Sequence, residues 1–151
     1  MKKLSVLFLA VALLLSGCGS LSHIPDTNGT EDFSLCSITQ EELIAKPTHV
    51  LQQNTVTASS NGRVSFRTRK LSGIAEIYRF TNWEAGDCVF TVSSALTEGN
   101  LKLYFYSDGK ILCDVPVGQT VTVTLPGVEG PCALRAAGES AAFSVEVRPG
   151  K

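Results

Sequence analysis

The chain has 151 residues, of which 44% are hydrophobic and 18% are charged, and its formal net charge is -1. This length suits one domain with short extensions, and so much apolar and so little charged sequence excludes a disordered chain. Because basic residues are not in excess, the composition also argues against nucleic acid as a partner.

The first 18 residues have the layout of a bacterial export signal. Two lysines precede an apolar run over residues 4–15. As a helix this run is about 18 Å long, which is too short to cross a hydrocarbon core of about 30 Å. The run ends in Leu15-Ser16-Gly17-Cys18, which resembles the lipobox of bacterial lipoproteins. We therefore interpret residues 1–17 as a lipoprotein signal peptide.

The lipobox resemblance implies cleavage before Cys18, diacylglycerol on the Cys18 sulfur and acylation of the new amino group. Two or three acyl chains anchor a protein stably, whereas one holds it only marginally. The resemblance therefore predicts a lipid-anchored protein on the exported side of a bacterial cell membrane or outer membrane. An ordinary cleaved signal, with Cys18 unmodified, remains the alternative.

A tether and one folded domain are expected after the signal. Residues 18–34 are small, polar and turn-forming without an apolar period, which is typical of a flexible tether, and residues 35–151 form the predicted domain. Near its start, Thr39 and Glu42 have the spacing of a capping box, and Pro47 ends the short apolar face that follows. We expect one short helix over about residues 39–46.

From residue 63 onward, apolar and polar side chains alternate, which is the period of half-buried strands. The clearest runs cover residues 63–69, 88–93, 101–106, 120–125 and 141–147, and shorter ones fit 74–80, 110–115 and 132–136. Turn signals separate the runs at Asn61-Gly62, Glu84-Ala85-Gly86, Glu98-Gly99, Asp108-Gly109, Val117-Gly118, Glu129-Gly130 and Gly138-Glu139. About eight short strands with this spacing predict an all-β protein, a single antiparallel, jelly-roll-like β-sandwich with one N-terminal helix.

Residues 87–147 carry a second resemblance. A strand is followed by Gly-Asn-Leu-Lys-Leu-Tyr-Phe-Tyr-Ser-Asp-Gly-Lys, a Thr-Val strand ending in Leu-Pro-Gly, and then Gly-Pro-Cys-Ala-Leu-Arg-Ala. This order is similar to that of bacterial pre-peptidase C-terminal domains and related accessory jelly-roll domains. Cys132 stands where that family has an aromatic residue, and Gly99-Asn100 replaces its acidic pair. The resemblance implies a β-sandwich with an accessory role and transfers no site.

Four cysteines remain after the anchor, namely Cys36, Cys88, Cys113 and Cys132. An even number in an exported chain favours disulfides, and four cysteines allow three pairings. We expect Cys88–Cys132 inside the sandwich and Cys36–Cys113 between the N-terminal segment and the sandwich, with buried free thiols as the alternative. No two of them have the close spacing of a structural zinc site, so no metal is predicted.

The sequence carries no catalytic motif. His23 falls in the tether and His49 follows the predicted helix, and there is no Gly-x-Ser-x-Gly, His-Glu-x-x-His or phosphate-binding glycine loop. Asp87, Asp108 and Asp114 are candidates for a calcium site, but aspartates beside turns are usually turn formers. We therefore expect neither enzyme activity nor a cofactor.

Two groups of side chains are candidate contact surfaces. Arg63, Arg67, Arg69 and Lys70 form the basic cluster of the sequence, with the three arginines on one side of a strand. We interpret them as the solvated face of an edge strand, while a phosphate-bearing polymer or an anionic lipid headgroup is the alternative partner.

The second group is aromatic and forms the candidate ligand face, made of Tyr78, Trp83, Tyr104 and Tyr106. Tyr104 and Tyr106 alternate with apolar residues of their strand and so point to its outer side. Aromatic rings on an exposed sheet stack on sugar rings, although packing between neighbouring strands also explains them.

These observations predict a lipid-anchored cell-envelope protein with a non-catalytic binding or structural role. Its expected partners are the membrane, through the anchor, and an envelope polysaccharide or protein. The alternative is an accessory or inhibitory subunit that docks a secreted enzyme through a strand edge or loops.

Overall fold

The computed structural model describes residues 38–53 and 55–150. Its elements are α1 (Gln40–Ile44), β1 (His49–Gln53), β2 (Val56–Ser60), β3 (Arg63–Ser107), β4 (Lys110–Val115) and β5 (Thr120–Pro149). The predicted signal peptide, Cys18, the tether with His23, and Cys36 lie outside the described residues. Within the described ranges, no helix has the length and apolar character that crossing a membrane requires.

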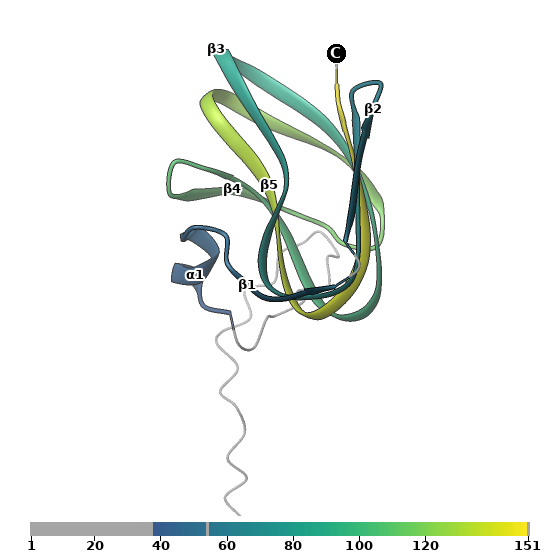
Figure 1. Ribbon diagram of the computed structural model, residues 1–151. Coiled ribbons are helices and arrows are strands. Elements are labelled where there is room, and N and C mark those ends of the chain that lie inside the picture. Colours follow the sequence, from purple (N-terminus) through teal and green to yellow (C-terminus); the bar gives the residue numbers. More distant parts are fainter. Residues whose placement is uncertain (1–37, 54, 151) are drawn as a thin grey trace, which may run out of the picture.

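The strands form an antiparallel sandwich in which β3 and β5 each run through both layers (Figure 1). In the first layer, the order across the sheet is β2, residues 63–68 of β3, residues 142–149 of β5, residues 90–98 of β3, and residues 120–125 of β5. In the second layer, the order is β1, residues 71–82 of β3, residues 130–139 of β5, residues 100–107 of β3, and β4. The predicted fold class is therefore confirmed.

Several predicted turns are bends within continuous strands, so the expected short strands are joined into longer ones. The bend at Gly99 connects the two layers, and its φ of 75° lies in the region that favours glycine. A Cβ at this position would lie 2.5 Å from the backbone oxygen of Glu139 on the facing strand, which is closer than real contacts. Two predicted hairpin turns are present as expected, Asn61-Gly62 and Asp108-Gly109, with positive φ at all four residues.

The main hydrophobic core lies between the layers, and the alternation of the sequence explains which side chains enter it. In β3, for example, Phe66 and Thr68 are buried while Arg63 and Arg67 are exposed on the outer face. The largest fully buried side chains include Leu71, Leu101, Leu103, Phe105, Leu125 and Leu134.

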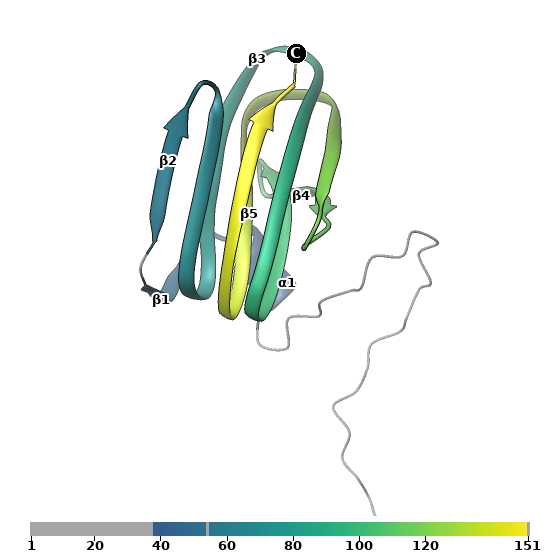
Figure 2. The same cartoon turned by 90° about the vertical axis from the view of Figure 1, so that its right-hand side faces the viewer.

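A second apolar cluster covers the outer face of the second layer, where α1 packs against the sheet. Leu43 of α1 is buried there with Ile74, Tyr104 and Ala137. The predicted capping box is present, because the Thr39 hydroxyl accepts from the backbone N–H of Glu42 and the Glu42 carboxylate accepts from the backbone N–H of Thr39. By contrast, no helix of residues 38–53 and 55–150 covers the outer face of the first layer, which Figure 2 shows from its open side.

Candidate ligand-binding site

The structure divides the predicted aromatic face into two parts. Tyr104 does point to the outer side of its layer, but α1 covers it completely and its side chain is 0% exposed. Its hydroxyl donates to the backbone oxygen of Leu43 at 2.8 Å. Burial raises the pKa of Tyr104 to about 12. Tyr104 therefore holds α1 in place and is not accessible to a ligand in this arrangement.

Arg135 completes this contact, and sequence reasoning did not single it out. Its Nη1 donates to the backbone oxygen of Ala45 at 2.9 Å, and its guanidinium carbon lies 3.5 Å from the centre of the Tyr106 ring. The side chain is 4% exposed, and its Nε has no hydrogen-bond partner within the described residues. The sequence did contain a signal for this role: Arg135 is the one charged residue of the apolar run 132–137, and a buried arginine needs a partner for its charge. Tyr106 and Arg135 thus belong to the support of α1.

Tyr78 lies elsewhere, on the inner side of the sandwich. The register of β3 shifts between Glu76 and Tyr78, and after this irregularity both Ile77 and Tyr78 contact the main core. The Tyr78 ring stacks on Phe80 with 5.9 Å between ring centres and meets the edge of Phe90 at 6.1 Å. Simple alternation could not reveal this placement, because the irregularity changes the face that the following residues occupy.

These rings line a pocket at the end of the sandwich opposite the bend at Gly99. We call it the aromatic pocket; its volume is about 310 Å³, and it is lined by Tyr78, Phe80, Thr81, Asn82, Asp87, Cys88, Val89, Phe90, Pro149 and Gly150. Desolvation raises the pKa of Tyr78, which is consistent with its partly buried position. Trp83 follows Asn82 directly and is 85% exposed. The pocket therefore combines ring faces, polar groups and an unburied indole close in sequence to its rim.

Side-chain hydrogen bonds from Asn82 and to Asp87 hold the rim of the aromatic pocket. The Asn82 side chain donates to the backbone oxygen of Val128 at 2.8 Å, and the Asp87 carboxylate accepts from the backbone N–H of Gly127 at 3.1 Å. Asp87 thus stabilises a bend, as expected of an aspartate beside a turn. Asp108 lies in the hairpin turn and Asp114 pairs with Lys102 at 2.7 Å. Within the described residues, no group of three metal-ligating side chains comes together.

The basic cluster begins on the outer face of the first layer with Arg63 and Arg67, and Arg69, which is also exposed, and Lys70 follow where β3 passes to the second layer. The expected position on an edge strand is wrong, because β2 pairs with this part of β3 on one side and β5 pairs with it on the other. The edge is β2, whose signal in the sequence was weak because its Val-Thr-Ala-Ser-Ser run is short and mostly polar.

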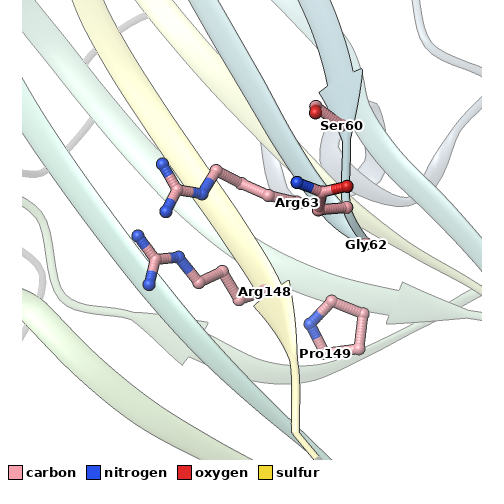
Figure 3. Close-up of a pocket in the computed structure, with 6 residues that line it drawn as sticks. Ser60, Gly62, Arg63, Arg148 and Pro149 are labelled. Atoms are coloured by element: carbon pink, nitrogen blue, oxygen red, sulfur yellow. The ribbon is translucent and has the colours of Figure 1, made fainter.

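A second pocket involves one of these arginines (Figure 3). We call it the arginine pocket; its volume is about 470 Å³, and Ser60, Asn61, Gly62, Arg63, Arg148 and Pro149 line it. Both guanidinium groups pair with Glu146, Arg63 through Nη1 at 3.2 Å and Arg148 through Nη2 at 2.8 Å. Pro149 lines both pockets, so the two hollows adjoin at the same end of the sandwich.

The expected disulfide between Cys88 and Cys132 is not formed, and Cys88, Cys113 and Cys132 are free thiols. Cys88 pairs with Leu125 in the first layer, whereas Cys132 pairs with Phe80 in the second. Packed layers lie about 10 Å apart, while a disulfide needs Cα atoms within about 4.4–6.8 Å. The partner expected for Cys113, Cys36, lies outside the described residues.

Comparison with known proteins gives only a distant likeness. No protein-family model and no curated protein matches the chain. Two similar solved structures are a mutant of a carbohydrate binding module of family 29 and a second mutant used to probe ligand recognition by that family. Each is 9% identical, with a TM-score of 0.36, over 68% of this chain and 77% of the other. A likeness at this level says nothing about what this chain binds.

Proposed function

We propose that the protein is a lipid-anchored, non-catalytic module of the bacterial cell envelope that binds an envelope polysaccharide at the aromatic pocket. The lipobox supports the anchor. The observation that carries the binding role is the aromatic pocket itself, which Tyr78, Phe80 and Phe90 line at an open end of the sandwich. Trp83, which does not line the pocket but follows Asn82 of its rim in sequence, is 85% exposed. Tryptophan is enriched at contact surfaces, because its ring offers a large apolar face and its N–H a hydrogen-bond donor.

The chemistry of the aromatic pocket suits sugar rings. The apolar C–H face of a sugar packs on an aromatic ring, while polar groups at the rim hydrogen-bond its hydroxyls. Tyr78 and Phe80 supply rings, and Asn82 and Asp87 supply polar groups beside them. The hydrogen bond from Gly127 uses Oδ1 of Asp87, so Oδ2 is left to accept a hydrogen bond from a sugar hydroxyl.

The position of the aromatic pocket also fits an anchored binding module. The described chain begins next to α1, which packs on the outer side of the second layer (Figure 1), while the aromatic pocket is lined by Pro149 and Gly150 near the C-terminus. A tether joined before α1 would therefore attach to the domain away from the aromatic pocket.

Binding is tested with the full mature chain in detergent and envelope polysaccharide from the source organism. Trp83→Ala and Tyr78→Leu should each weaken retention on the polysaccharide by about tenfold, since stacked rings contribute roughly 0.5–1.5 kcal/mol beyond burial. Leu112→Ala is the matched control, because Leu112 is an exposed apolar side chain outside the pocket. Equal retention of all four proteins would reject the aromatic pocket as the binding site.

The anchor needs its own test. Cells that express the chain and are fed labelled palmitate should incorporate the label, and Cys18→Ala should abolish it and release the protein from membranes. Label that persists in the Cys18→Ala variant would show that another residue carries the acyl chain and would refute the lipobox assignment.

A second candidate function is docking of a secreted enzyme, and β2 favours it. All five side chains of this edge strand are exposed, and none is charged or a proline. Natural edge strands usually carry charged residues or prolines, which prevent pairing with another chain. The edge of β2 lacks them and is therefore able to accept a further strand. Ala58→Pro should abolish capture of a secreted enzyme from the same organism while leaving polysaccharide retention intact. Capture that survives Ala58→Pro would exclude this alternative.

A further inference from the structure

The arginine pocket has features that the aromatic pocket lacks. Arg63 extends from the start of β3 and Arg148 from the end of β5, and Figure 3 shows their guanidinium groups side by side and pointing the same way. Arginine groups arranged in this way present several N–H donors in fixed planes, which is the geometry that recognises carboxylate and phosphate groups.

The charges of this pocket do not balance. Two guanidinium groups share the single carboxylate of Glu146, which leaves one positive charge in excess. Glu146 uses Nη1 of Arg63 and both Nε and Nη2 of Arg148. These contacts leave the Nη2 of Arg63 and the Nη1 of Arg148 for an anion, and each of these nitrogens carries two N–H donors.

The walls of the arginine pocket leave room for a sugar unit. Asn61 and Gly62 form a tight turn with φ of 51° and 72°, and a Cβ at Gly62 would meet nothing within 4 Å. The volume of about 470 Å³ lies within the range of small-molecule sites. Arg67 continues the same exposed face of β3, about 13 Å further along at 3.3 Å per residue, so an extended polymer would meet another positive charge.

We propose that the arginine pocket is an anion subsite, and that the polysaccharide bound at the aromatic pocket carries carboxylate or phosphate groups. This inference rests on the proposed function, because it identifies the chemical class of the same ligand. Pro149 lies between the two pockets, so one chain can place a ring in the aromatic pocket and its charged group between Arg63 and Arg148. Glu146 acts as the internal competitor that a ligand anion partly displaces.

The test compares three soluble polymers on the full mature chain in detergent. They are polygalacturonate, the same polymer after chemical reduction of its carboxyl groups, and poly(glycerol phosphate). The first two differ only in charge, and the third distinguishes phosphate from carboxylate. Affinity is measured by titration calorimetry at low salt and again with added sodium chloride, which screens charge-dependent binding.

Two variants should weaken binding of a charged polymer and a third should strengthen it. Arg63→Gln and Arg148→Gln should each weaken binding of a charged polymer by about tenfold and leave the reduced polymer unaffected. Glu146→Gln should strengthen binding several-fold, because it releases both guanidinium groups. Arg79→Gln is the matched control, since Arg79 is also an exposed arginine in a salt bridge, with Glu76, and lines neither pocket. Thermal melting of each variant checks that it remains folded.

The outcomes separate the two proposals. If neither charged polymer binds better than the reduced one, or if Arg79→Gln has the same effect as the pocket variants, the anion subsite is refuted. If envelope polysaccharide binds through Trp83 and Tyr78 but Arg63→Gln and Arg148→Gln bind it normally, the proposed function stands and the inference fails. If charged polymers depend on the arginines but not on Trp83 or Tyr78, the subsite stands and the aromatic pocket loses its role.

Discussion

Replacing Tyr104 by phenylalanine removes one buried hydroxyl and nothing else. This hydroxyl donates to the backbone oxygen of Leu43 at 2.8 Å, in a position with no solvent exposure. A hydrogen bond of this kind contributes about 1 kcal/mol, so Tyr104→Phe should lower the free energy of unfolding by about that amount at pH 7. The melting temperature should fall by roughly 3–6 °C for a domain of this size.

The pKa of Tyr104 makes the effect depend on pH. Its folded-state value of about 12 lies above the unfolded value of 10.0, because burial disfavours the phenolate. The protonated hydroxyl therefore contributes its full stability below pH 10, and this stability is lost as pH rises from 10 to 12. The full loss is about 2–3 kcal/mol, at 1.36 kcal/mol per pKa unit. The phenylalanine variant has no such group, so the two proteins should be equally stable near pH 11.

Urea unfolding followed by fluorescence, from pH 7 to pH 11.5, measures both quantities. Other groups that titrate in this range are common to both proteins and cancel in the difference. Tyr106→Phe is the control, because its hydroxyl only accepts from the exposed backbone N–H of Gly109 and should contribute less than about 0.5 kcal/mol. A constant difference between wild type and Tyr104→Phe at every pH would refute the assignment of a buried, raised pKa to Tyr104.

Other consequences can be measured on the same protein. Gly99→Ala should destabilise it by about 2–4 kcal/mol in urea unfolding, since it adds a clash to an unfavourable φ, whereas Gly109→Ala, with open space around its Cβ, should cost only about 1 kcal/mol. Arg135→Met should accelerate limited proteolysis around residues 38–47 while the melting temperature of the sandwich changes little; unchanged proteolysis would show that Arg135 does not hold α1. Burial raises the pKa of Cys88, with smaller contributions from Cys132 and a nearby carboxylate, so its alkylation by iodoacetamide should be slow at pH 7 and accelerate above about pH 9. Cys132, which is 2% exposed, should react only after unfolding, and equal rates for the two thiols would contradict this packing.

The sequence was sufficient for the features that depend on local patterns. Alternation predicted which side of β3 bears Phe66 and which bears Arg63, and positive φ at Asp108-Gly109 follows from the needs of a tight hairpin turn. The capping box at Thr39 is also a local feature, since its partners are three residues apart. Each of these depends on neighbours along the chain.

Features that depend on the third dimension were not predictable in the same way. An irregularity near Glu76 turns Tyr78 to the inner side of the sandwich, where it packs against the edge of the core, and no periodicity reveals it beforehand. Likewise, the outward direction of Tyr104 was predicted, but its burial depends on α1, which comes 61 residues earlier in the chain. The arginine pocket needed both Arg63 and Arg148, whose proximity arises only when β3 and β5 pair.

The position of residues 142–149 within the first layer has a consequence for the order in which the chain can fold. This part of β5 lies between residues 63–68 and residues 90–98 of β3, so it is the central strand of the first layer and joins its two halves. Val64 and Val147 are partners, although 83 positions separate them in sequence. Pairing at such separations is slow, because a long loop must close before any contact rewards it. A ribosome that has made everything up to Gly138 holds a chain whose first layer is still in two pieces. The first layer therefore cannot be completed until almost all of the chain has been synthesised.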